Sequence, residues 1–97
     1  MAAFLIVNFD VGDPAMYKDY QKGAVPSLGI GTNAKVVAYD TASKQVEGQG
    51  AGHQTVVLEY ASVEEAQAAY DSEAYQAVLP LRLQATSKHF GLIVKGP

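Results

Sequence analysis

The N-terminal run Ala3–Phe9, with the sequence AFLIVNF, limits the possible folds of this chain more than any other feature. Its apolar residues fall on both faces of an extended strand, because successive side chains alternate between the faces. Such a strand is typical of the centre of a sheet that is covered on both sides. A chain of 97 residues is small, and domains of this size bury only about 60–65% of their surface on folding. We therefore expect a second copy to cover one face, in a homodimer.

Helix signals and further strand patterns follow in alternation. Asp13 and Pro14 are residues that begin helices, as a cap and as the first helical residue. Ser62 and Glu65 have the spacing of a capping box. The expected elements are strands at 3–9, 35–40, 53–60 and 88–95, a helix from 13 that ends between 23 and 29, helices at 62–70 and 73–86, a turn at 41–44, a short hairpin arm at 45–47 and a flexible loop at 48–52. This order predicts one α+β domain over residues 1–97, of the ferredoxin-like βαββαβ type.

Composition argues against several classes of partner. The net charge is −3, and the basic residues are scattered singly, whereas nucleic-acid and anionic-membrane binding need clustered cations. There is no cysteine. Small secreted domains usually need disulfides, so the composition argues against secretion. The apolar run at 3–9 is too short for a signal peptide or a membrane span. We expect a cytoplasmic protein that binds neither nucleic acid nor membrane.

Two charged residues are the candidates for catalysis. Glu59 shares a strand face with His53 and Thr55, and a buried carboxylate there would have a raised pKa suited to a general base. Otherwise Glu59 is a strand-end carboxylate paired with a basic residue. Arg82 lies in the middle of an apolar helical stripe, where its charge needs a partner such as Glu59, a helix end or a ligand carboxylate. Otherwise its head group reaches water. We predict that both belong to one buried polar cluster.

Polar and aromatic residues on the strands and helices are candidates for ligand binding. Asn8 interrupts the first strand and is either a pocket wall or part of a cross-strand network. Tyr39 suits the wall of a pocket for a flat molecule, and Tyr75 packs in the core with its hydroxyl at the rim. With Thr55 and His53 they complete the predicted ligand-binding set. The two histidines lack metal-ligand spacing, and no nucleotide, flavin, haem or nicotinamide motif is visible. We therefore expect no metal and no cofactor.

Several motifs along the chain resemble a known family. The frame of Asp-Pro-x-x-Tyr after the first strand, the segment VVLEY, the run Tyr70–Tyr75 (YDSEAY), Arg82 and the closing segment IVKG are similar to the family named domain of unknown function 1330. The likeness spans nearly the whole chain. It implies a small dimeric α/β-barrel protein with a ferredoxin-like protomer, whose sheet packs on that of a second copy with a cavity near the packed strands.

Three classes of function remain open. The favoured one is a protein that binds a small organic acid or carbonyl compound in a barrel cavity. The second is a cofactor-independent enzyme of the isomerase, cyclase or monooxygenase type, with Glu59 as acid or base, an analogy that rests on the fold alone. The third is a purely structural dimer. A cavity holding Glu59 and Arg82 would favour the enzyme, and a cavity filled by side chains would favour the structural dimer.

Overall fold

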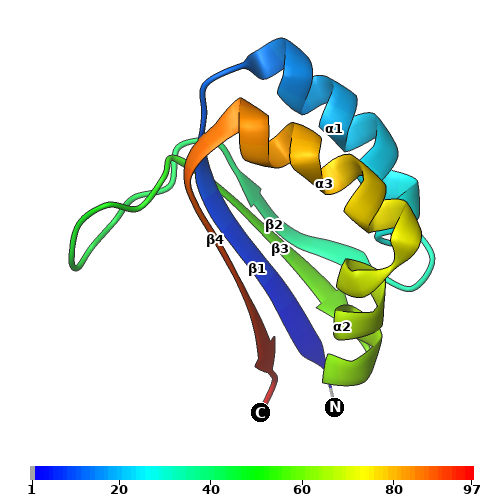
Figure 1. Ribbon diagram of the computed structural model, residues 1–97. Helices are drawn as coiled ribbons and strands as arrows, with labels where there is room; N and C mark the ends of the chain where they lie inside the picture. The colour runs from blue at the N-terminus through cyan, green and yellow to red at the C-terminus, as the bar shows by residue number, and fades with distance from the viewer. Residues whose placement is uncertain (1) are drawn as a thin grey trace.

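The helices and strands follow the predicted order (Figure 1). The computed structural model describes residues 2–97. The elements are β1 (Ala3–Val11), α1 (Pro14–Ser27), β2 (Lys35–Asp40), β3 (Gln54–Tyr60), α2 (Val63–Asp71), α3 (Glu73–Ala85) and β4 (Thr86–Lys95). The strand order is β2-β3-β1-β4, and all neighbouring strands are antiparallel. This topology confirms the predicted ferredoxin-like α+β fold.

Short polar motifs begin all three helices. The Asp13 carboxylate accepts a hydrogen bond of 3.1 Å from an amide of the first turn of α1, with Pro14 in the first helical position. Ser62 caps α2 by accepting from an amide at 3.1 Å, and Ser72 caps α3 at 3.2 Å. The Ser72 cap starts a new helix here, which explains why α2 and α3 are two separate helices. No helix within residues 2–97 is long and apolar enough to span a membrane.

Some boundaries differ from those predicted. β1 continues to Val11 and β4 begins at Thr86, because these ends pair with each other. The predicted hairpin arm at 45–47 forms no strand, and residues 41–53 make one long connection between β2 and β3. Tertiary pairing between distant strands thus determined where these strands end, and the sequence signals of turns did not.

The helices all cover one face of the sheet (Figure 1). Ala3, Leu5, Val7 and Phe9 of β1 point toward the helices and form the centre of the core. We call the opposite side the open face. Its larger apolar residues include Phe4, Ile6, Val57, Phe90, Leu92 and Val94. Within the protomer β1 is thus covered on one side only, and the three β4 side chains of the open face are 37–53% exposed.

Candidate functional site

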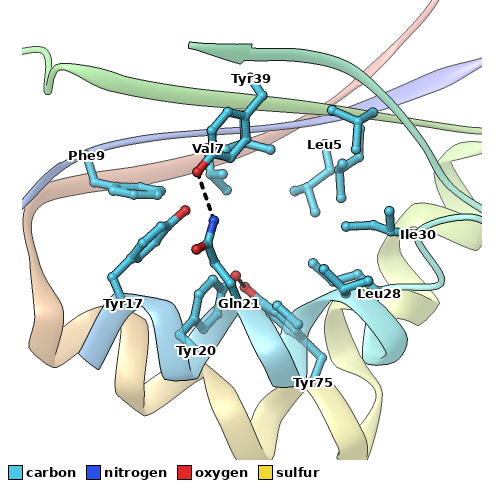
Figure 2. Close-up of a pocket in the computed structure, with 15 residues that line it drawn as sticks. Leu5, Val7, Phe9, Tyr17, Tyr20, Gln21, Leu28, Ile30, Tyr39 and Tyr75 are labelled. Atoms are coloured by element: carbon cyan, nitrogen blue, oxygen red, sulfur yellow. Dashed lines mark hydrogen bonds between the residues drawn. The ribbon is translucent and has the colours of Figure 1, made fainter. Parts of the chain in front are cut away.

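A cavity of about 140 Å³ lies between α1 and the helix-covered face of the sheet (Figure 2). Side chains of β1, β2, β3, α1 and α3 line it together with the turn after α1. Valine and alanine at Val7, Val56 and Ala24 are small, so the helix and the sheet leave this space between them. The mouth lies toward the edge strand β2, where Val36 and Tyr39 are exposed. The family resemblance implied a cavity near the packed sheets of two copies. This cavity lies instead inside each protomer, between the sheet and its own helices.

The polar groups of this apolar wall are four tyrosine hydroxyls and one glutamine. The Tyr20 and Tyr75 hydroxyls, from α1 and α3, lie 2.7 Å apart in a buried hydrogen bond. At the mouth, the Gln21 amide donates to the Tyr39 hydroxyl at 2.8 Å and so joins α1 to β2 (Figure 2). The remaining hydroxyl, of Tyr17, accepts from another side-chain amide at 2.9 Å. These side chains supply the few polar groups of an otherwise hydrophobic space.

Arg82 lies behind the aromatic wall of the cavity. Its side chain is only 3% exposed, and its Cζ atom lies 5.4 Å from the ring centre of Phe9 and 5.8 Å from that of Tyr20. The ion pairs found within residues 2–97 do not include it, and its Nε atom has no hydrogen-bond partner. A guanidinium without a carboxylate partner is costly to bury. Ring faces compensate for part of that cost, and an incoming anion would compensate for more.

Burial and neighbouring oxygens shift the pKa values of this group of side chains. Burial raises the pKa of Tyr17 and of Tyr20 well above the usual value. Both hydroxyls therefore remain neutral hydrogen-bond donors at physiological pH. Burial acts to lower the pKa of Arg82, but the adjacent tyrosine oxygens, first that of Tyr75, outweigh it and leave the pKa raised. The arginine is thus permanently charged, as arginines generally are.

The chemistry available to the cavity is binding through donated hydrogen bonds. Within the described chain, none of the residues that line the cavity carries a carboxylate or an imidazole, which are the usual general bases. Neutral hydroxyls with raised pKa values are poor bases but good donors. A carbonyl or carboxylate oxygen can meet the Tyr20–Tyr75 pair, with the charge of Arg82 behind it.

The structure separates the predicted site residues into two groups. Tyr39 and Tyr75 line the cavity, and Arg82 lies directly behind its wall. Glu59 pairs with Phe4 on the open face and lies beside the turn before β2. The prediction of one buried Glu59–Arg82 cluster is wrong, because the register of β3 points Glu59 to the opposite side of the sheet.

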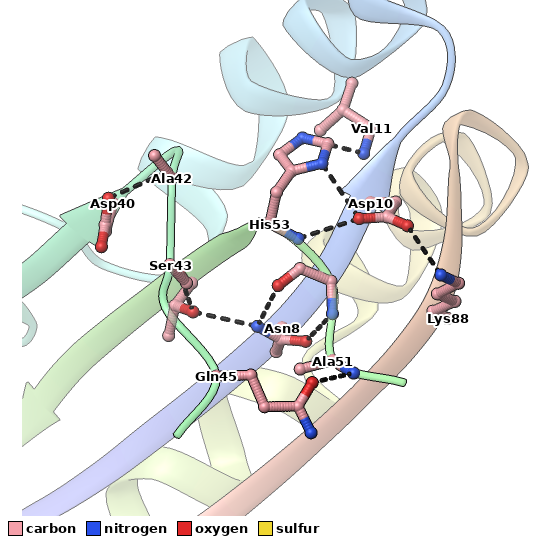
Figure 3. Close-up of polar contacts among 12 residues, drawn as sticks. Asn8, Asp10, Val11, Asp40, Ala42, Ser43, Gln45, Ala51, His53 and Lys88 are labelled. Atoms are coloured by element: carbon pink, nitrogen blue, oxygen red, sulfur yellow. Dashed lines mark hydrogen bonds and ion pairs between the residues drawn. The ribbon is translucent and has the colours of Figure 1, made fainter. Parts of the chain in front are cut away.

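The second group contains Asn8, Thr55 and His53, and it organises the start of β3 (Figure 3). The Asn8 amide donates to the Thr55 hydroxyl at 2.9 Å, which agrees with the cross-strand network considered above. The His53 imidazole lies 2.9 Å from the Asp10 carboxylate, with the Lys88 ammonium 3.5 Å from the same carboxylate. No cluster of three metal-ligating side chains occurs in the part of the chain described. These residues lie outside the cavity.

Several lining residues were not identified from the sequence as ligand contacts. Tyr17 and Tyr20 are buried in the core and also line the cavity. Gln54 does not itself line the cavity, but it is only 4% exposed and donates to the hydroxyls of Tyr17 and Tyr39, which do line it. Gln54 is the one strongly polar residue among the side chains of β3 that face the helices. This break in an apolar pattern was the only sequence signal of its role.

The fold and the cavity together define the class: a small ferredoxin-like α+β protein with a tyrosine-lined pocket under its first helix. The model of the family named domain of unknown function 1330 matches residues 2–97. The chain therefore belongs to that family, as its motifs indicated. No curated protein matches the sequence.

Solved structures share the fold at low sequence identity. A protein of unknown function from Rhodopseudomonas palustris superposes with a TM-score of 0.74 at 16% identity, over 99% of this chain and 82% of that one. SnoaB, a cofactor-independent oxygenase from Streptomyces nogalater, gives 0.67 at 7% identity, over 98% and 92%. A dimeric ferredoxin-like protein of unknown function from Thermobifida fusca gives 0.64 at 15% identity, over 99% and 92%. At such identities the likeness establishes the fold only.

Proposed function

We propose that this protein binds a small, mostly apolar organic molecule with a carbonyl or carboxylate group in the cavity under α1. The observation that carries the proposal is Arg82, a buried guanidinium with no carboxylate partner beside an apolar space lined by tyrosine hydroxyls. Small-molecule sites typically combine an apolar wall with a few convergent polar groups. Arg82 supplies the positive charge, and Tyr20 and Tyr75 supply the hydrogen bonds.

The size of the cavity restricts the ligand. An apolar cavity of roughly 150 Å³ accepts benzene, and the space here is about 140 Å³. A single aromatic ring or a short branched chain with one polar group is the appropriate class. Tyr39 and Gln21 hold the mouth, so entry requires their hydrogen bond of 2.8 Å to open.

The alternatives receive less support. A cofactor-independent enzyme is consistent with the fold of the oxygenase SnoaB, but Glu59 lies on the open face and cannot act as its base in this cavity. A purely structural dimer would need a cavity filled by side chains, whereas space remains here. A cytoplasmic location stays a prediction from composition.

We also propose that the functional unit is a homodimer formed through the open face. Phe90 and Leu92 are half exposed there, and apolar strand faces of this kind are typical of protein interfaces. Structural neighbours are described as dimeric. Sedimentation equilibrium at micromolar concentration should give twice the protomer mass of 10.3 kDa, and a mass of one protomer only would overturn the proposal.

Thermal unfolding with benzoate, benzamide and toluene tests the ligand class directly. A ligand at a hundredfold excess over its Kd stabilises the folded state by about 2.7 kcal/mol. We expect benzoate and benzamide to raise the Tm by several degrees, and toluene to raise it less. Ala24→Leu, which fills the cavity, should abolish the shift. No shift with any of these probes, or with larger aromatic and aliphatic acids, would contradict the proposal.

A matched pair of tyrosine variants locates the binding. Tyr75→Phe removes one hydroxyl from the cavity. Tyr60→Phe removes an equally buried hydroxyl that donates to the Leu28 carbonyl at 2.7 Å and lies outside the cavity lining. One hydrogen bond is worth about 0.5–1.5 kcal/mol, so Tyr75→Phe should weaken benzoate binding several-fold and Tyr60→Phe should not. Equal effects would place the ligand elsewhere.

A further inference from the structure

The connection between β2 and β3 is much longer than the pairing of these strands requires. It contains the thirteen residues 41–53, from the end of β2 at Asp40 to the start of β3 at Gln54. Adjacent antiparallel strands are usually joined by two to five residues. We call residues 41–53 the arm. It projects from the end of the sheet on the side away from the helices (Figure 1).

The base of the arm is firmly attached to the open face (Figure 3). The Asn8 side chain makes two hydrogen bonds with Gly52, donating to its carbonyl at 3.1 Å and accepting from its amide at 2.6 Å. The hydroxyls of Ser43 and Thr55 lie 2.6 Å apart, and Asp10 accepts from the His53 amide at 2.8 Å. Asn8 and Thr55 are paired neighbours on the open face, so the arm leaves the molecule from that face.

The outer part of the arm is braced by its own side chains. The Gln45 amide donates to the Glu47 carbonyl at 2.8 Å and accepts from the Ala51 amide at 3.0 Å. Val46 nevertheless has 85% of its surface exposed. A single exposed valine is normal by itself, so the significance of Val46 depends on where the arm is attached, beside the exposed apolar residues of the open face.

We propose that the arm holds a second copy of this chain, with Val46 packing against the partner. This inference rests on the dimer proposed above. The second copy is the favoured occupant because the arm starts on the open face, next to its exposed apolar residues Phe90 and Leu92. A twofold interface uses the same surface on both copies, so each dimer would contain two equivalent arms. The Asn8–Gly52 contact then serves assembly.

Sedimentation equilibrium of three aspartate variants separates the arm from the dimer itself. Val46→Asp places a charge on the arm, and Leu92→Asp places one on the open face. Leu83→Asp is the matched control, because Leu83 is 41% exposed on α3 and lies away from the open face. We expect Val46→Asp to weaken the dimer by roughly tenfold or more, since two apolar contacts are lost. Leu92→Asp should dissociate it, and Leu83→Asp should have no effect.

The outcomes distinguish the two proposals. A dimer that Leu92→Asp dissociates and Val46→Asp leaves intact would keep the dimer and overturn the role of the arm. A monomeric unmodified protein would overturn both. Circular dichroism of each variant checks that it remains folded.

A labelling experiment gives an independent result. The chain has no cysteine, so Val46→Cys creates a single thiol for a benzophenone photocrosslinker. We expect crosslinked dimers in which the arm is joined to the sheet of the other copy. Crosslinks found only within one chain would contradict the proposal.

Discussion

Replacing Arg82 with methionine should leave the stability of the free protein nearly unchanged and lower its affinity for an anion. Methionine has a similar length and no charge. The guanidinium is 3% exposed and makes no ion pair within the described residues. The substitution therefore removes a buried charge whose desolvation costs several kcal/mol. It also removes two contacts with the rings of Phe9 and Tyr20, each worth about 0.5–2 kcal/mol.

The balance of these two quantities gives the expected magnitude. Replacing a buried ion pair or triad with apolar residues is often neutral or stabilising by about 1–4 kcal/mol, and Arg82 has no ion-pair attraction to lose within the described residues. The two lost ring contacts together offset about 1–4 kcal/mol of this gain, so we expect the free energy of unfolding of Arg82→Met to stay within about 2 kcal/mol of that of the unmodified protein. One kcal/mol moves the Tm of a domain of this size by roughly 4–8 °C. Binding of benzoate should fall several-fold, because Arg82 does not line the cavity and acts on the anion from behind the wall; a direct charge-assisted hydrogen bond, worth about 1.5–3 kcal/mol, is the upper limit.

Urea unfolding, followed by circular dichroism with and without benzoate, measures both quantities. The protomer concentration must be the same in all samples, because dimer stability depends on it. Arg82→Lys keeps the positive charge but loses the planar guanidinium, so it separates the effect of the charge from the effect of the side-chain shape. A loss of more than about 2 kcal/mol in Arg82→Met without ligand would show that the arginine stabilises the core. Equal stabilisation of the variant and the unmodified protein by benzoate would show that Arg82 does not bind the anion.

Three further predictions concern stability. Gly52→Ala should destabilise the protein by about 1–3 kcal/mol, because a Cβ there would collide with the Phe9 carbonyl group, whereas Gly12→Ala has room and should be tolerated in urea unfolding. The hydrogen bond from the His53 amide lowers the pKa of Asp10 below its usual 3.8. The stability that the ionised Asp10 contributes is therefore present above about pH 4 and is lost as the pH falls further. Asp10→Asn should flatten that part of the stability–pH curve, and a curve that does not change would refute the prediction. Burial raises the pKa of Tyr60 to about 12, so stability should fall as the pH rises above about 10, and absorbance at alkaline pH should show late ionisation of buried tyrosines that exposed ones do not share.

Part of the candidate site followed from residue type and helical spacing. Arg82 was identified because a charge in an apolar helical stripe needs a partner, and it is buried as this reasoning requires. Tyr39 and Tyr75 do line the cavity. Glu59 was misplaced because alternation shows which residues share a face of a strand, but it does not show which face the helices cover. A shift of one residue reverses every side chain of a strand.

The local elements of this protein could be predicted because their causes are local. Caps such as Asp13 and Ser62 satisfy amides within one helical turn, and strand alternation depends on neighbours along the chain. The position of the cavity depends instead on where α1 crosses the sheet, and on small side chains from strands far apart in the sequence. Because β1 is apolar on both faces, hydrophobicity alone did not select the covered face. The packing of the helices selected it, and with it which tyrosines face the cavity and which residues remain for a partner.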